Sequence, residues 1–304
     1  MRKVLRVLAW LALPVGILLQ LWLKDRHVSW ALFYYAMPKP CLVGLAFVLA
    51  IDSRRVRCQQ MIAVMAMISL MIWWLMTSYA LGKTELSTAA PANDDVTLLY
   101  WNLCRPNGLD REAVELVREH QPHIAAFVEP GKEAGNFTKS YEALLPGYKA
   151  AWMPRGILWL SRVPSRYRER GKLEGLGAYA RFDVDGFGAT FPVVVADVFP
   201  GIFQSREKQL QEAFAQSKDR RDAILVGDFN TPLESHFFDE PRKNYVNALD
   251  VMGSGFRETW PVGLPLLSID HAWIGQDWEV IEARKIWNLA GSDHAAILVR
   301  LRRR

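Results

Sequence analysis

Residues 223–231 read AILVGDFNT, and this stretch indicates how the larger part of the chain folds. The apolar run 223–226 predicts a strand buried on both faces, and Gly227 allows a tight turn at its carboxyl end. Alternate residues of an extended chain point the same way, so Asp228 and Asn230 are expected on one side. The stretch therefore predicts a polar site at a strand end, although a Gly-Asp pair is also typical of a simple turn.

Strand-like and helix-like stretches alternate on both sides of this strand. Residues 96–101 predict a strand that ends at Asn102, residues 110–119 an amphipathic helix, and residues 124–128 a buried strand that ends at Glu129. Further strands are expected over residues 157–161, 178–184, 187–197, 272–274 and 295–301, and a polar helix over residues 204–220. This alternation indicates the α/β class.

Turn-forming residues give two more local expectations. Asp185-Gly186 predicts the turn of a β-hairpin, and Pro192 places its strand at a sheet edge or a bulge. Residues 235–267 lack a clear period and contain several Pro and Gly residues, so they are expected to be mostly loops. Loops at the rim of a site are where substrate choice is expected to lie.

The amino-terminal part of the chain has the composition of a membrane anchor. Residues 7–23 are an uncharged apolar run near the lower length limit for a bilayer span, and residues 61–81 are a longer one. Residues 28–51 are apolar but interrupted by Pro38-Lys39-Pro40, which indicates either a kinked third span or a re-entrant segment. We expect three spans within residues 1–82, because a cleaved signal peptide would explain only the first run.

A polar, Pro-containing stretch follows the anchor. Residues 83–95, KTELSTAAPANDD, predict a linker, so residues 96–304 are expected to form a separate folded domain. The basic residues set the expected orientation: with a cytoplasmic amino terminus, Arg2, Lys3, Arg6, Arg54, Arg55 and Arg57 are inside and Lys24, Arg26 and Lys83 outside. Three spans then predict a multi-pass cell-membrane protein with its domain on the outer face, whereas two spans would return the domain to the cytoplasm.

Composition argues against several classes of protein. The net charge is +5 and the basic residues are scattered or terminal, which is weak support for nucleic-acid binding. The chain has three cysteines, Cys41, Cys58 and Cys104, too few and too separated for a disulfide framework or a thiolate metal site.

Several short motifs resemble, in the same order, those of the endonuclease/exonuclease/phosphatase superfamily, which includes apurinic endonucleases, deoxyribonuclease I-like enzymes, sphingomyelinases and inositol polyphosphate phosphatases. The motifs are YWN (residues 100–102), FVE (127–129), LSRVP (160–164), GDFN (227–230), SIDH (268–271) and SDH (292–294). The resemblance implies a four-layered α-β-β-α sandwich of the deoxyribonuclease I-like type, here preceded by transmembrane helices.

The resemblance also implies roles for individual residues. The implied metal ligands are Asn102, Glu129 and Asp293, and the implied catalytic residues are Asp228, Asn230, Asp270 and His294. The cation would be Mg²⁺ or Mn²⁺, since a hard cation prefers oxygen ligands and keeps waters that a substrate phosphate can displace. Asp228 would orient or deprotonate the attacking water, Asn230 would hold a phosphate oxygen, and His294, fixed by Asp270, would stabilise the transition state.

Two positions depart from the family pattern. The family usually has a histidine after the strand at residues 187–197, whereas this chain has Asp197, which either substitutes for the histidine or is a strand-end turn residue. A carboxylate repels a phosphate unless a cation lies between them. Cys104 occupies a position where some nucleases of the family have an acidic metal ligand, and a buried, inert thiol is expected there.

These inferences together predict a membrane-anchored, divalent-metal-dependent phosphoesterase. Its substrate would be a phosphate ester or a pyrophosphate, and the membrane anchor favours a lipid-linked one at the membrane surface. One alternative is a metal-dependent endonuclease or exonuclease. The other is a membrane scaffold that retains the fold without catalysis.

Overall fold

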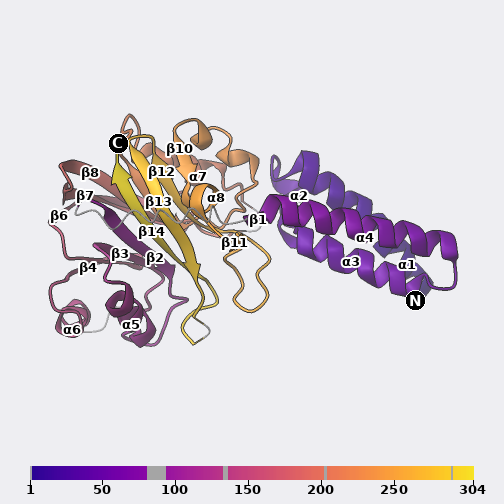
Figure 1. The fold of residues 1–304 in the computed structure, drawn as a ribbon, viewed down its shortest axis with the longest axis horizontal. Coiled ribbons are helices and arrows are strands. Elements are labelled where there is room, and N and C mark those ends of the chain that lie inside the picture. Colours follow the sequence, from indigo (N-terminus) through magenta and orange to yellow (C-terminus); the bar gives the residue numbers. More distant parts are fainter. Residues whose placement is uncertain (1, 81–93, 133–135, 202–203, 289) are drawn as a thin grey trace.

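The computed structural model describes residues 2–80, 94–132, 136–201, 204–288 and 290–304. A bundle of apolar helices is followed by a larger body built on two β-sheets (Figure 1). The predicted linker lies outside the described residues except for Asp94 and Asp95, so the predicted domain boundary stays a prediction.

The bundle contains four helices and one π-helical turn among its described residues. They are α1 (Arg2–Leu18), the turn η1 (Leu19–Leu23), α2 (Val28–Ala36), α3 (Lys39–Asp52) and α4 (Arg57–Ser78). Two stretches, Lys3–Leu23 and Arg57–Ser78, are long and apolar enough to cross a membrane. Helices α2 and α3 are bent by 65° and would make a third span only if taken together. Two or three apolar helices could therefore span a membrane.

Contacts at the two ends of the bundle show how α3 runs through it. At the end far from the body, Arg6 donates to Ser53 at 3.0 Å and pairs with Asp52 at 3.1 Å, so the start of α1 lies beside the end of α3 (Figure 1). At the end near the body, Gln20 donates to the carbonyl of Met37 at 3.1 Å, just before α3 begins. Helix α3 thus connects the two ends of the bundle.

Two six-stranded mixed sheets form the body. One has the order β13-β14-β2-β3-β5-β4 and the other β10-β12-β9-β8-β7-β6. The strands of the first sheet are β2 (Val96–Asn102), β3 (Ile124–Val128), β4 (Lys149–Met153), β5 (Ile157–Ser161), β13 (Trp278–Ile286) and β14 (Ala296–Arg303). Those of the second are β6 (Ser165–Lys172), β7 (Ala178–Gly186), β8 (Ala189–Asp197), β9 (Ile224–Asp228), β10 (Tyr245–Asn247) and β12 (Asp270–Gly275).

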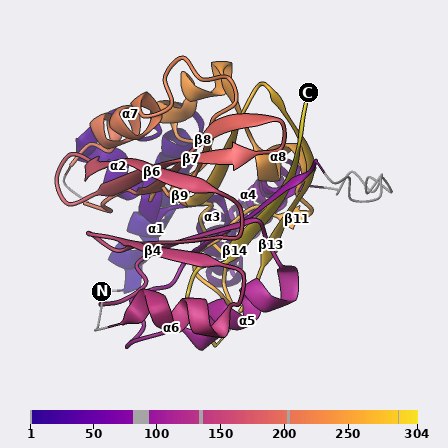
Figure 2. The same cartoon turned by 90° about the vertical axis from the view of Figure 1, so that its left-hand side faces the viewer.

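Helices cover the outer face of each sheet. Helices α5 (Arg111–His120) and α6 (Phe137–Leu144) lie on the first sheet, and α7 (Glu207–Ala215) lies on the second (Figure 2). The α-β-β-α order of layers confirms the predicted fold class, an α/β sandwich of the deoxyribonuclease I-like type preceded by long apolar helices.

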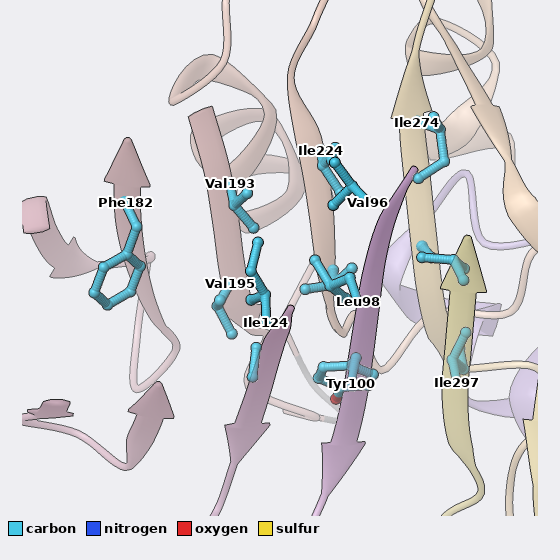
Figure 3. Close-up of a cluster of buried hydrophobic side chains, with 14 of the residues drawn as sticks. Val96, Leu98, Tyr100, Ile124, Phe182, Val193, Val195, Ile224, Ile274 and Ile297 are labelled. Carbon is cyan, nitrogen blue, oxygen red and sulfur yellow. The ribbon is translucent and has the colours of Figure 1, made fainter. Parts of the chain in front are cut away.

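The central core lies between the two sheets and follows the period of two along each strand. Val96, Leu98 and Tyr100 of β2 point inward toward residues of the second sheet such as Val195 and Ile224 (Figure 3). The intervening residues of β2 face α5 and α6. Both faces are buried, which explains why these strands have continuous apolar runs.

The structure corrects two local predictions. The hairpin turn is Phe187-Gly188, because Gly186 already pairs with Ala189, and both turn residues have the positive φ (54° and 85°) of a two-residue turn. Strand β8 is not an edge strand, since it lies between β7 and β9. Proline has no backbone N–H, but Pro192 precedes the first β8–β9 pair at Val193, so no hydrogen bond to β9 is lost there.

Several elements were not expected from the sequence, among them α6, β4, β6 and β13. Strand β6, SRYRERGK, has charged side chains on both faces and no apolar alternation, and it is ordered by pairing with β7 at a sheet edge. The predicted loop region contains η2 (His236–Phe238), η3 (Pro241–Lys243), β10, α8 (Ala248–Met252) and β11 (Gly255–Phe256).

The bundle contacts the body through polar side chains and one short strand pair. Strand β1 (Tyr79–Ala80) continues α4 and pairs with β11. Lys39, at the bend between α2 and α3, pairs with Glu234 at 2.7 Å with its side chain only 7% exposed. The buried Asp25 accepts hydrogen bonds from Ser235 and from the backbone N–H of His236. The segment that follows Asn230 is therefore held against the bundle.

Candidate active site

Strand register brings the predicted residues of the second sheet into one row. Asp228 ends β9 and pairs with Asp270 at the start of the antiparallel β12. On its other side, Asp228 pairs with Asp197 at the end of the parallel β8. Asn102 ends β2 in the facing sheet and donates to Asp228 at 2.9 Å. The site therefore lies at the ends of strands from both sheets.

His294 and Asp270 form a fixed pair. The His294 Nδ1–H donates to Asp270 at 2.9 Å, and the other Asp270 oxygen accepts from the hydroxyl of Tyr100 at 3.2 Å. The side-chain hydroxyl of Thr259 accepts the backbone N–H of Asp270 at 3.1 Å. The carbonyl of His294 accepts from the indole of Trp101 at 2.8 Å. These contacts leave Nε2 of His294 facing the carboxylate of Asp228, 4.0 Å away.

Asp228 is held by its own turn as well as by Asn102. Its second oxygen accepts the backbone N–H of Asn230 at 2.8 Å. Asn230 has φ of 46°, so the extended geometry assumed for residues 228–230 ends at Asp228. The side-chain amide of Asn230 donates to the carbonyl of Val198 at 2.8 Å. Asn230 thus lies beside Asp228, with its amide N–H engaged by the neighbouring strand.

The pKa values of the site follow from its buried carboxylates. Burial alone would lower the pKa of His294, but the charges of Asp270, Asp228 and Asp293 outweigh it and raise this pKa to about 10. Burial, together with the charge of Asp270, raises the pKa of Asp228 well above its usual range. Burial and the nearby Glu129 raise the pKa of Asp197 to about 7. The site thus combines a charged imidazolium with acids that hold their protons unusually well.

Glu129 lies on a neighbouring cavity of about 650 Å³, which Asp197 also lines. Glu129 pairs with Arg105 at 2.6 Å, and Lys132 and Arg155 lie on the same cavity wall. Both residues of the ion pair have a positive φ, 49° at Glu129 and 56° at Arg105. A second cavity of about 670 Å³, between α7 and the η2–η3 region, contains none of the predicted site residues.

Among the described residues, Asp228, Asp270 and His294 form a group that could hold a metal ion, with one ligand atom from each within 4.8 Å of the others. Glu129 and Asp293, two of the predicted ligands, are outside this group. The third, Asn102, uses its side-chain oxygen to accept the backbone N–H of Cys104 at 2.9 Å. Two of the predicted ligands nevertheless contact this group, since Asn102 donates to Asp228 at 2.9 Å and Asp293 lies 3.8 Å from the Nε2 of His294.

Other contacts of the site were not anticipated from the sequence. Arg105, Tyr100 and Trp260 were not expected at the site, although Tyr100 falls at an inward-facing position of a predicted strand. Trp260 donates to Asp293 at 2.8 Å, and its ring centre lies 6.5 Å from that of His294. Cys104 is exposed, so the expectation of a buried thiol was wrong.

Comparison with known proteins places these observations in a family. Residues 99–294 match the model of the Endonuclease/Exonuclease/phosphatase family. No curated protein matches the chain significantly. The solved structures similar to it include humanized D. rerio TDP2, an endonuclease/exonuclease/phosphatase from Bacteroides vulgatus and the human Nocturnin catalytic domain.

These similarities extend over the body but rest on few identical residues. The D. rerio protein is 14% identical over 69% of this chain and 99% of its own, with a TM-score of 0.53. The Bacteroides vulgatus protein is 14% identical over 69% and 99%, with a TM-score of 0.52. Human Nocturnin is 16% identical over 71% and 97%, with a TM-score of 0.50. At these identities the structures establish the fold alone.

Proposed function

Because the chain belongs to the endonuclease/exonuclease/phosphatase family, we propose that it is a membrane-anchored, metal-dependent phosphoesterase that acts on a lipid-linked phosphate ester or pyrophosphate. The observation that carries this proposal is the attachment of the site to the apolar helices. After Asp228, the chain contacts the bundle through Glu234, which pairs with Lys39. Before Asp270, it does so through Glu258, which accepts from the indole of Trp74 at 3.0 Å.

This attachment favours a substrate that stays in the bilayer. Both segments beside the Asp228–Asp270 pair are held at one end of the bundle, so the site belongs to the part of the body nearest the helices. A soluble substrate would need no such placement. A phosphate carried by an apolar chain would reach the site while its chain remained in lipid.

The chemistry follows from the geometry of the protein's own groups. The raised pKa of Asp228 makes its carboxylate a stronger base, which suits a residue that orients a water and takes its proton. His294 stays protonated because of Asp270, so its Nε2–H is available to a phosphate oxygen on which charge develops. Asn230, beside Asp228, would donate to a second phosphate oxygen through the side-chain N–H that does not bond to Val198.

The proposed cation would be held by side-chain oxygens, and one of these ligands, Glu129, lines the cavity beside the site. Asn102, Glu129 and Asp293 would hold Mg²⁺ or Mn²⁺, which when bound supplies positive charge against the phosphate oxygens. Oxygen ligands suit these hard cations. We favour this position over the Asp228–Asp270–His294 group, because it uses the ligands that the family motifs imply and because the His294 Nδ1 is already committed to Asp270.

We also propose that α1, α3 and α4 each cross the membrane, with the body outside the cell. Arg6 contacts the end of α3, so the basic residues at the start of α1 and those around residues 54–57 lie at one end of the bundle. The body lies at the other end (Figure 1). Basic residues are enriched on the cytoplasmic side of membrane proteins, which supports a position of the body on the outer face. Helix α3 alone is about 21 Å long, so α2 would supply the rest of that span.

A nuclease is the second candidate. The observation that favours it is the group of cationic side chains, Arg105, Lys132 and Arg155, around the cavity beside Glu129. The same three charges would also suit the second phosphate of a pyrophosphate. They do not extend into the basic stripe that is typical of nucleic-acid binding.

The test is a substrate panel with the full-length protein in lipid nanodiscs. We expect release of phosphate from isoprenyl pyrophosphate, isoprenyl monophosphate or phosphatidic acid in the presence of Mg²⁺ or Mn²⁺, and its loss on addition of EDTA. A His294→Gln variant with unchanged thermal unfolding is the matched control and should be inactive. Cleavage of single-stranded DNA alone would make the protein a nuclease. A folded protein inactive on every substrate would favour the scaffold alternative.

A further inference from the structure

Aromatic residues mark where the bundle leaves the lipid on the side of the body. Trp22, at the end of η1, is 74% exposed, and Tyr79, just after α4, is 44% exposed. Trp and Tyr are enriched where a membrane protein crosses the boundary between lipid and water. Both residues lie at the end of the bundle that contacts the body, so the bilayer surface is expected at this level.

A loop of the body lies at the same level. Leu266 and Leu267 line a small cavity together with residues from the ends of the bundle helices. The bundle residues in this cavity include Gln20, Pro38, Pro40 and Ser78. The loop is therefore next to the ends of three helices, where the bilayer surface would be.

The composition of this loop is unusual for a protein surface. Residues 260–266, WPVGLPL, contain no charged residue, and we call this segment the lip loop. Leu264 is 67% exposed, which makes it one of the most exposed large apolar side chains of the body. Single exposed apolar residues are common, but an uncharged projecting loop beside membrane helices is typical of a segment that contacts lipid.

The lip loop is also bonded directly to the candidate active site. Trp260 donates from its indole to the Asp293 carboxylate at 2.8 Å, and the backbone N–H of Val262 donates to the Asp293 carbonyl at 2.7 Å. The backbone N–H of Ala295 donates to the carbonyl of Thr259 at 2.9 Å. The residues on both sides of His294 are thus fixed to the loop or to its first neighbour.

We propose that the lip loop docks into the headgroup region of the bilayer that holds the bundle, with Leu264 inserted toward the acyl chains. The loop then forms a continuous apolar surface from the lipid to His294, along which the apolar chain of a substrate lies while its phosphate is in the site. The docking rests on the membrane anchoring proposed for the bundle and not on the proposed catalysis. The placement of the substrate chain along the loop rests on both.

The occupant of this surface is lipid and not a second protein, for two reasons on the molecule itself. The loop lies beside the end of a bundle whose outward-facing residues include apolar ones such as Met76, which is 80% exposed two residues before the end of α4. The docking surface is a single projecting loop, which suits insertion between headgroups better than the broad packed area of a stable protein interface.

A depth measurement tests the docking without relying on catalysis. Leu264→Cys is made in a full-length background in which Cys41, Cys58 and Cys104 are serine, labelled with an environment-sensitive fluorophore and reconstituted in nanodiscs. We expect blue-shifted emission, quenching by a quencher attached to the lipid acyl chains and protection from aqueous iodide. Leu144→Cys, at the end of α6 on the far side of the body, is the control and should be quenched by iodide (Figure 1).

Two results of this measurement would overturn the docking. Equal iodide quenching at residues 264 and 144 would place the lip loop in water. Protection of residue 264 from both the iodide and the lipid quencher would mean that protein covers the loop.

An activity measurement tests the substrate step. Leu264→Glu should lower turnover of the long-chain substrate in nanodiscs by about tenfold or more, because a charged side chain cannot replace the apolar area that leucine contributes. Turnover of a soluble short-chain phosphate ester should not change, and Leu264→Met should behave like the parent on both substrates. Equal loss on both substrates would indicate a distorted site and would overturn the substrate step. If the parent hydrolyses neither substrate, the proposed function fails while the depth measurement still decides the docking.

Discussion

Replacing Asp228 by asparagine separates its chemical role from its structural one. The carboxylate accepts one hydrogen bond from Asn102 at 2.9 Å and one from the backbone of Asn230 at 2.8 Å. Asparagine has nearly the same shape but only one accepting oxygen, so one of these two bonds is lost. It also cannot take a proton from water, which is the role proposed for Asp228.

The structure gives the size of both effects. One lost hydrogen bond costs about 1 kcal/mol, and removal of the repulsion between the buried Asp228 and Asp270 offsets part of it. The free energy of unfolding should therefore change by less than about 1 kcal/mol, a shift of only a few degrees in Tm. Loss of a general base lowers turnover by roughly 10²-fold or more.

The matched control is Asp197→Asn, which makes the same chemical change at the residue paired with Asp228 in the sheet. Turnover of each variant is measured in nanodiscs on the preferred substrate, and thermal unfolding is followed in parallel. We expect a much smaller loss at Asp197. The reasoning would be refuted if Asp228→Asn kept most of its turnover. It would also be refuted if both variants lost turnover equally, because Asp197 would then perform the role of the histidine that the family usually has at this position.

Four further outcomes are expected. Tyr100→Phe removes the buried hydrogen bond to Asp270 and should lower the free energy of unfolding by about 1–2 kcal/mol in urea titrations, with a smaller loss of turnover than Asp228→Asn. Lys39→Met leaves the Glu234 carboxylate without its nearest cation and should destabilise the full-length protein by roughly 3 kcal/mol, while adding Glu234→Gln should restore part of the loss; strictly additive effects in this double-mutant cycle would count against the pairing. Burial, then Arg162, lowers the pKa of His123 from 6.5 to about 4, so the unfolded chain binds a proton that the folded chain excludes; stability should fall as the pH drops from 6.5 to about 4, and His123→Gln should flatten this part of the profile. A reporter fused after Arg304 and active only outside the cell should give a signal, and a signal from a cytoplasm-specific reporter instead would leave only two spans.

The sequence by itself determined the strands that are buried on both faces and the residues at their ends. The runs that became β2, β3 and β9 are apolar because both faces are covered, so they were predicted almost to the residue. The motifs on these strands also indicated the family. By contrast, β6 has no apolar period, and only its pairing with β7 makes it a strand.

The tertiary structure decided which of the polar residues meet. Asp228, Asp270 and His294 come together because β12 pairs antiparallel with β9 and because Trp101 and Asp270 hold His294 in place, and register of this kind is not encoded in local pattern. It also decided that the guanidinium of Arg105 pairs with Glu129, which the sequence predicted only as a metal ligand.

The attachment of the site to the bundle was likewise beyond the sequence. Lys39 and Glu234 are 195 residues apart, and each is ordinary in its local context, a lysine between two prolines and a glutamate in a loop. Local composition predicts which segments are apolar because burial of each strand or helix acts on that segment's own side chains. It does not predict which distant polar groups pair, since that depends on how the completed bundle and sheets pack together.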